Sequence, residues 1–136
     1  MGCKSPITLL VFAEVLGKHG PGPVFLCHGT PSSRLNRPDD ESTRALGVRL
    51  IAIDRPGCGL SDFLPGRTLL DWPTDLAAVA DALGIGRFAV VGFSGGGPYV
   101  AASAFALPDR GAHGVDDDGF ADCHRRPNYL TRVSVL

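Results

Sequence analysis

The stretch of sequence that decides the fold runs from residue 87 to residue 98 and reads RFAVVGFSGGGP. Residues 88–91 are a short apolar run typical of a buried strand, and the small residues from Gly97 onward favour a helix. Between the two lies a pentapeptide in which Ser94 has a glycine two positions before it and another two positions after it. A strand that turns sharply into a helix lifts a serine hydroxyl clear of the backbone and places an N–H donor beside it. This context predicts that Ser94 is a nucleophile.

Phosphate-binding patterns are missing from the same stretch. Residues 92–98 contain neither G-x-G-x-x-G nor a Gly-Lys pair followed by Ser or Thr. A glycine-rich turn that binds a dinucleotide or a nucleoside triphosphate is therefore not indicated, and we expect no cofactor.

Composition narrows the class of protein further. The chain has 136 residues, of which 44% are hydrophobic and 20% charged, and its net charge is −1. Such a chain is neither disordered by composition nor polarised toward nucleic acid or an anionic membrane. The apolar run at residues 7–12 is too short to cross a bilayer and lacks the layout of a secretory signal, so we expect a cytoplasmic protein. The four cysteines show neither C-x-x-C spacing nor histidines at metal-ligand distances, which predicts free thiols and no metal site.

Strand and helix patterns alternate along the chain, which is typical of an α/β fold with a mostly parallel sheet and crossover helices. We expect strands at residues 7–15, 23–27, 48–53 and 88–91. A polar segment at residues 31–46 is loosely helical and ends at Gly47. Residues 71–83 have an N-cap candidate in Asp71, an early proline and apolar positions at helical spacing, with Gly84 as the stop. A further helix is expected at residues 99–107.

Four blocks of sequence together resemble the α/β-hydrolase superfamily, in its serine-nucleophile branch. They are HGTP at residues 28–31, DRPGCGLSD at 54–62, ALGI at 82–85 and VGFSGGGP at 91–98. Four blocks in this order and spacing are much more specific than one pentapeptide. The resemblance implies a partial α/β-hydrolase fold over residues 1–110 that stops after the helix following Ser94. It also implies that strand 23–27 lies between strands 48–53 and 88–91.

The resemblance also implies a catalytic arrangement. Ser94 would attack the carbonyl of a small ester-like substrate, and the backbone N–H groups of Gly95 and Thr30 would form the oxyanion hole. His28 and Gly29 would shape the loop that carries Thr30, while Gly92 and Gly96 would support the turn at Ser94. A serine nucleophile argues against the epoxide hydrolases and haloalkane dehalogenases of this fold, which use an aspartate.

The remaining residues, 111–136, depart from the family pattern. Residues 111–128 contain no apolar run of four, so we expect no buried strand there. Either the tail is a frame-shifted or truncated product, or the protein is a short form in which residues 131–136 supply a late strand. The order serine, acid, histidine could be completed within the tail by His124 together with Asp116, Asp117, Asp118 or Asp122. A polar tail of this length, however, offers no scaffold for such residues.

These observations lead to a serine hydrolase by family whose chain carries the nucleophile and the oxyanion hole but not an identified acid and histidine. We expect the 136-residue chain assayed alone to be nearly inactive. The alternatives are a noncatalytic product or interaction module on the same scaffold, and activity restored by a complementing chain. A strand left at the sheet edge, residues 88–91, would also favour a homo-oligomer.

Overall fold

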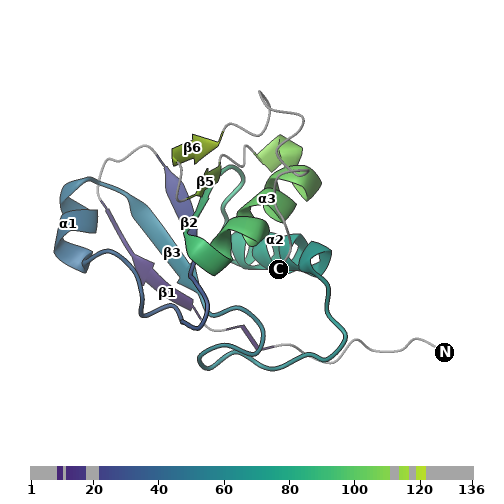
Figure 1. Ribbon diagram of the computed structural model, residues 1–136. Coiled ribbons are helices and arrows are strands. Elements are labelled where there is room, and N and C mark those ends of the chain that lie inside the picture. The colour runs from purple at the N-terminus through teal and green to yellow at the C-terminus, as the bar shows by residue number, and fades with distance from the viewer. Residues whose placement is uncertain (1–8, 11, 18–21, 111–113, 117–118, 122–136) are drawn as a thin grey trace.

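A computed structural model describes residues 9–10, 12–17, 22–110, 114–116 and 119–121 (Figure 1). The main sheet contains four strands, which are β1 (Phe12–Val15), β2 (Pro23–Cys27), β3 (Arg49–Ile53) and β4 (Ala89–Gly92). Within these described residues three α-helices accompany the strands, namely α1 (Asp40–Ala45), α2 (Trp72–Ala82) and α3 (Gly97–Ala106). Single 3-10 turns lie at Leu69–Asp71, Ser94–Gly96 and Pro108–Arg110.

The strand order in the main sheet is β1-β3-β2-β4. Strand β2 pairs in parallel with β3 on one side and with β4 on the other, and Phe25 stands opposite both Ile51 and Val90. Strand β1 is antiparallel to β3 at the opposite edge from β4. The mostly parallel sheet and the central position of β2, both expected from the sequence, are confirmed. Parallel neighbours bring the carboxyl ends of β2 and β4 to the same edge, where the loops carrying Thr30 and Ser94 begin.

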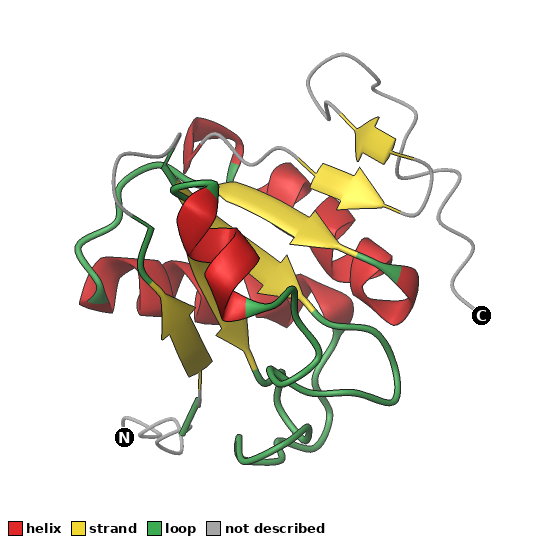
Figure 2. Ribbon diagram, turned by 90° about the vertical axis from the view of Figure 1, so that its left-hand side faces the viewer, coloured by secondary structure: helices red, strands yellow, loops and turns green. Residues whose placement is uncertain are grey.

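Helices α2 and α3 lie together against one face of this sheet (Figure 1, Figure 2). Side chains alternate along a strand, so Phe25 and Cys27 of β2 face these helices together with Ile51 and Ile53 of β3. They pack against Trp72, Leu76, Val79 and Val100 in one buried cluster. Full burial of each large apolar side chain contributes about 1.5–3 kcal/mol, so this layer holds the strand ends rigidly beneath the candidate site.

The helix expected at residues 71–83 is observed as α2, with Pro73 in its first turn. A capping box precedes it, in which the Asp71 carboxylate accepts from the backbone N–H of Thr68 at 2.6 Å. Beyond its C-terminus the backbone turns through Gly84, whose φ of +68° is one that a side chain disfavours. Helix α2 therefore begins and ends where the sequence predicted, within one residue.

The other sheet face carries a smaller cluster formed by Val15, Leu26, Leu50 and Ala52. Helix α1 on this side has only six residues, fewer than the loosely helical segment expected at residues 31–46. It starts late because Pro38 precedes the N-cap Asp39, whose carboxylate accepts from the N–H of Ser42 at 2.8 Å. It is followed by Gly47, with φ of +73°.

Two three-residue strands, β5 (Gly114–Asp116) and β6 (Gly119–Ala121), lie in the segment where no buried strand was expected. They pair with each other as a separate antiparallel sheet and do not join the main ladder. Strand β5 lies beside β4 and α3 (Figure 2). Residues 122–136, which include His124 and the alternative late strand, fall outside the described residues. So do residues 7, 8 and 11 of the first expected strand.

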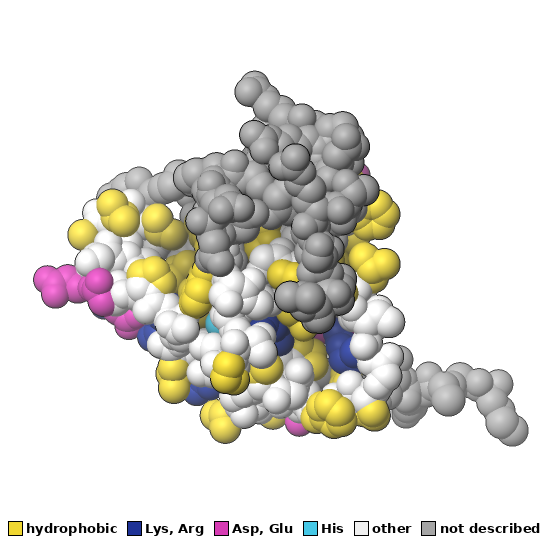
Figure 3. Space-filling view, viewed as in Figure 1, with side chains coloured by type: hydrophobic (Ala, Val, Ile, Leu, Met, Phe, Trp, Pro, Cys, Tyr) yellow, Lys and Arg dark blue, Asp and Glu magenta, His cyan; other side chains and the backbone are white. Residues whose placement is uncertain are grey.

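Charged side chains on the face drawn in Figure 3 form no large basic area. Acidic side chains gather at α1, whose first turn contains Asp40 and Glu41, and the visible Lys and Arg side chains are scattered. None of the helices in the described part of the chain is both long and apolar enough to cross a membrane.

Candidate active site

The turn after β4 has the strained geometry that the sequence predicted. Phe93 is extended, with φ of −136° and ψ of 153°, and Ser94 then takes φ of +50° as the first residue of the 3-10 turn that leads into α3. Among the described residues, Ser94 is the only one other than glycine with a positive φ. A side chain in this region costs of order 1–3 kcal/mol, and such residues concentrate at functional sites. The strained turn at Ser94 is thus confirmed, whereas its nucleophilic role stays a prediction.

Two glycines allow this turn to pack. A Cβ on Gly96 would overlap the carbonyl oxygen of Cys27 and lie 3.0 Å from that of His28, so the turn sits directly on the end of β2. A Cβ on Gly92 would come within 2.7 Å of Val100 in α3 and 3.0 Å of the Gly96 backbone. Both positions need glycine because backbone or a helix side chain approaches closely, and their role in supporting a nucleophile stays a prediction.

The loop after β2 lies against the same turn. A Cβ on Gly95 would be 3.0 Å from the backbone nitrogen of Thr30 and 2.5 Å from its Oγ1. A Cβ on Gly29 would be 3.6 Å from Cβ of Ser94. Residues 29–30 and 94–95 are therefore neighbours in space although 65 positions separate them along the chain. The sequence predicted this juxtaposition from the order of the strands.

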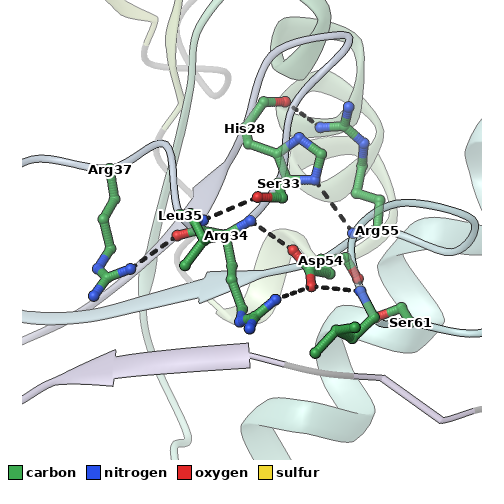
Figure 4. Close-up of polar contacts among 9 residues, drawn as sticks. His28, Ser33, Arg34, Leu35, Arg37, Asp54, Arg55 and Ser61 are labelled. Atoms are coloured by element: carbon green, nitrogen blue, oxygen red, sulfur yellow. Dashed lines mark hydrogen bonds and ion pairs between the residues drawn. The ribbon is translucent and has the colours of Figure 1, made fainter.

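His28 is buried, and both of its ring nitrogens are engaged. Nδ1 lies 2.8 Å from the carbonyl oxygen of Gly29. The backbone N–H of Arg55 donates to Nε2 at 3.3 Å (Figure 4). This arrangement requires the neutral tautomer with the proton on Nδ1. Burial lowers the pKa of His28 and is only partly opposed by its bond to Gly29, which keeps the ring neutral. The side chain shapes the loop and has no nitrogen left for a substrate.

Sequence reasoning gave no role to Arg55, which the structure places at the centre of this loop. The residue is 3% exposed, and its guanidinium donates to the carbonyl oxygens of His28 and Gly29 and to Oγ1 of Thr30. Its central carbon lies 4.2 Å from the centroid of the Tyr99 ring in α3. A signal was present in the sequence, because an arginine two positions after the last residue of β3 is brought to the same sheet edge as His28.

The preceding residue, Asp54, stabilises a second loop next to the site (Figure 4). Its buried carboxylate accepts from the backbone N–H of Arg34 at 2.6 Å, from the Arg34 guanidinium at 2.5 Å and from the N–H of Leu60 at 3.0 Å. Burial by itself would raise the pKa of Asp54, but these hydrogen bonds outweigh it and the pKa is lowered. Gly59, with φ of +54°, leaves no room for a Cβ beside this carboxylate.

A general base for Ser94 is not identified in the parts of the chain that the structure describes. Within them His28 is the only histidine, because positions 19, 113 and 124 fall outside. Burial raises the pKa of the Cys27 thiol to about 12, so it cannot serve as a thiolate at neutral pH. The same residues contain no group of three His, Cys, Asp or Glu side chains placed to hold a metal ion.

The fold is that of a partial α/β hydrolase, and comparison with known proteins agrees. The α/β hydrolase fold family matches residues 22–115, so the chain belongs to this family. No significant match was found among curated proteins.

Solved structures of several hydrolases resemble the chain. A thermophilic esterase from Thermogutta terrifontis is 32% identical with a TM-score of 0.64, covering 74% of this chain and 37% of its own. Epoxide Hydrolase A from Mycobacterium thermoresistibile is 26% identical with a TM-score of 0.64, covering 77% of this chain and 34% of its own. A predicted CIB-like hydrolase from Thermoplasma acidophilum, at 20% identity, shares the fold with a TM-score of 0.70 over 80% of this chain and 56% of its own. The chain thus spans about a third to just over half of these proteins.

Proposed function

We propose that this protein is a serine hydrolase that cleaves small ester-like substrates by acyl transfer, with Ser94 as the nucleophile. One observation supports this above the others: Ser94 alone among the described non-glycine residues has a positive φ, directly before a glycine that packs on Thr30. A nucleophile elbow needs this conformation, because it exposes the hydroxyl and sets the next backbone N–H beside it.

In the proposed reaction Oγ of Ser94 attacks the carbonyl carbon of the substrate, and the hydroxyl proton passes to a general base. The carbonyl oxygen becomes an oxyanion that accepts hydrogen bonds from the N–H groups of Gly95 and Thr30. The intermediate then collapses, the bond to the leaving alkoxide breaks, and the alkoxide takes up the proton. Water then attacks the acyl carbonyl and gives its proton to the base, the bond to Oγ of Ser94 breaks, and Oγ takes up the proton as the acid is released. Loss of one oxyanion donor typically costs about 3–4 kcal/mol of barrier.

The residue at the elbow guides the choice of substrate. Both an esterase and an epoxide hydrolase resemble the chain, at 32% and 26% identity. Epoxide opening in this superfamily uses an aspartate at the elbow, whereas this chain has Ser94. Esters, lactones, thioesters and amides all present the carbonyl that a serine attacks, and we propose an ester-like substrate from this group.

The general base and its supporting acid are the parts of the mechanism that Ser94 still requires. In the superfamily both follow the nucleophile in sequence on separate loops. We propose that the 136-residue chain without such partners retains only the acceleration due to binding and oxyanion donors, about 10³–10⁴ over water. A complementing chain that supplies both groups would restore turnover.

This proposal is tested by the reactivity of serines toward a fluorophosphonate. Attack by Oγ forms an O–P bond, fluoride leaves, and the proton passes to water. We expect Ser94 to be modified ahead of the other serines, as read by mass spectrometry of peptides. Ser94→Ala should remove the adduct, and Ser103→Ala, which truncates a buried α3 serine bonded to the Tyr99 carbonyl, should keep it. Equal labelling of several serines, or none at Ser94, would contradict a nucleophilic role.

A further inference from the structure

Arg55 is a buried cation without a carboxylate partner. No Asp or Glu in the described ranges lies within salt-bridge distance of it, unlike Arg34, which pairs with Asp54. Its guanidinium is instead satisfied by the loop at residues 28–30 and by the Tyr99 ring. Burial of a charge is costly unless its donors are satisfied. Fixing this loop is therefore the contribution of Arg55 that its contacts support.

We propose that Arg55 is a positioning residue that aims the backbone N–H of Thr30 into the oxyanion hole. This inference rests on the proposed function, since it assigns how one of the two oxyanion donors is oriented. Arg55 itself does not need to touch the substrate.

The geometry of one peptide group carries the argument. The carbonyl of Gly29 and the N–H of Thr30 belong to the same planar trans unit, so they point in opposite directions. The Gly29 oxygen lies 3.2 Å from Nη2 of Arg55 and 2.8 Å from Nδ1 of His28, and these two donors use both of its lone pairs. With the oxygen held on that side, the Thr30 N–H must point to the other.

The other side of this peptide group is the elbow. The Thr30 nitrogen lies 3.0 Å from the position of a Cβ on Gly95. A flipped peptide would turn the Gly29 oxygen toward the elbow and place a negative dipole where the oxyanion must form. Arg55 and His28 together exclude that conformation.

Arg55 is held in turn by the helical layer. Its guanidinium stacks on Tyr99, and the Tyr99 ring meets the Trp72 ring edge to face, with centroids 5.8 Å apart. A planar fork can contact two carbonyls and a hydroxyl while it stacks on a ring, whereas a lysine ammonium cannot match that geometry. The stack links the oxyanion loop to α2 and α3.

The test compares three variants of the full chain. Arg55→Met keeps the length of the side chain without donors, and Arg55→Lys keeps the charge without the fork. Arg110→Met is the matched control, because Arg110 also donates to two carbonyls, those of Gly86 at 2.6 Å and Ile85 at 2.7 Å, and lies over the Phe88 ring. Circular dichroism checks that each variant is folded. If Arg55→Met does not fold, the comparison is made with Arg55→Lys alone.

The first measurement is the binding of phenylboronic acid. Boron accepts the Ser94 oxygen, the hydroxyl proton is released to water, and the tetrahedral boronate, which is an anion with its formal charge on boron, places a hydroxyl oxygen in the oxyanion hole. Loss of the hydrogen bond from the Thr30 N–H to this anionic group should weaken binding about 10- to 100-fold. We expect that loss in both Arg55 variants and a change below about twofold in Arg110→Met. Equal affinity in wild type and the Arg55 variants would overturn the inference.

The second measurement does not depend on catalysis. The carbonyl ¹³C shift of Gly29 and the amide ¹⁵N shift of Thr30 should change in the Arg55 variants and stay constant in Arg110→Met. If phenylboronic acid fails to bind wild type while these shifts change in the Arg55 variants, Ser94 is not the nucleophile, but the inference that Arg55 holds the Gly29–Thr30 peptide group is supported. If neither shift responds, Arg55 does not hold the peptide group and the inference is wrong.

Discussion

Replacement of Gly96 by alanine should lower the free energy of unfolding, whereas the same replacement at the neighbouring Gly97 should not. The added Cβ would overlap the carbonyl oxygen of Cys27 and lie 2.9 Å from the carbonyl carbon of that residue. These atoms are backbone at the end of β2, the central strand, so no side chain can rotate away to make room. The N-terminus of α3 must move outward instead.

The expected magnitude follows from two opposing terms. Overpacking at a rigid site costs typically 1–3 kcal/mol, and contacts with backbone favour the upper half of that range. Replacing glycine by alanine also restricts the unfolded chain and gains about 0.4–1 kcal/mol. We therefore expect a net loss of about 2 kcal/mol in the free energy of unfolding, a large part of the about 5–15 kcal/mol typical of a folded domain.

Gly97→Ala is the matched control. Gly97 is the first residue of α3 and has φ of −54°, and a Cβ there would meet nothing within 4 Å. Alanine is the better helix former, so we expect this variant to be as stable as wild type or about 0.5 kcal/mol more stable. The same glycine-to-alanine replacement at two adjacent positions should thus change the free energy of unfolding in different directions.

Urea denaturation followed by tryptophan fluorescence measures both variants. Trp72 is the only tryptophan and is 2% exposed, so its emission reports loss of the α2–α3 layer. The midpoint should fall for Gly96→Ala and not for Gly97→Ala, at a constant slope with urea. A midpoint for Gly96→Ala within about 0.5 kcal/mol of wild type would refute the close packing of the elbow on β2, and so would an equal loss in both variants.

Two further outcomes are expected. The free energy of unfolding should fall as the pH is lowered below about 6.5, because burial lowers the pKa of His28 in the folded protein and the unfolded chain takes up the proton first. In urea titrations at several pH values, His28→Asn should reduce the dependence of the free energy of unfolding on pH. An unchanged dependence would contradict a buried neutral ring. Strand β4 ends the main sheet in the part of the chain that the structure describes, and β5 beside it pairs with β6 instead. We therefore expect concentration-dependent self-association in light scattering, and a monomer at every concentration would contradict an open edge at β4.

Much of the scaffold could be predicted because its signals are local. Helix α2 follows from Asp71, Pro73 and Gly84, and strands β2, β3 and β4 from short apolar runs between turn residues. The strain at Ser94 was predictable for the same reason, since a serine between two glycines at a strand-to-helix junction has few conformations that connect both elements. The late start of α1 also had a local signal in Pro38, which the looser prediction for residues 31–46 did not use.

The sequence by itself determined the α/β class, the strained turn at Ser94 and the adjacency of the loops at residues 28–30 and 94–96, because the family resemblance carried by the four blocks implied the strand order. Only the tertiary structure decided that β1 runs antiparallel, that the neutral His28 uses both ring nitrogens, and that Arg55 holds the Gly29 carbonyl. The reason is physical: each of these features involves a contact between residues at least 26 positions apart in the sequence, and Arg55 is also a buried cation that must find acceptors there. Local propensity carries no information about such long-range contacts, since they form only when β2, β3 and α3 pack together.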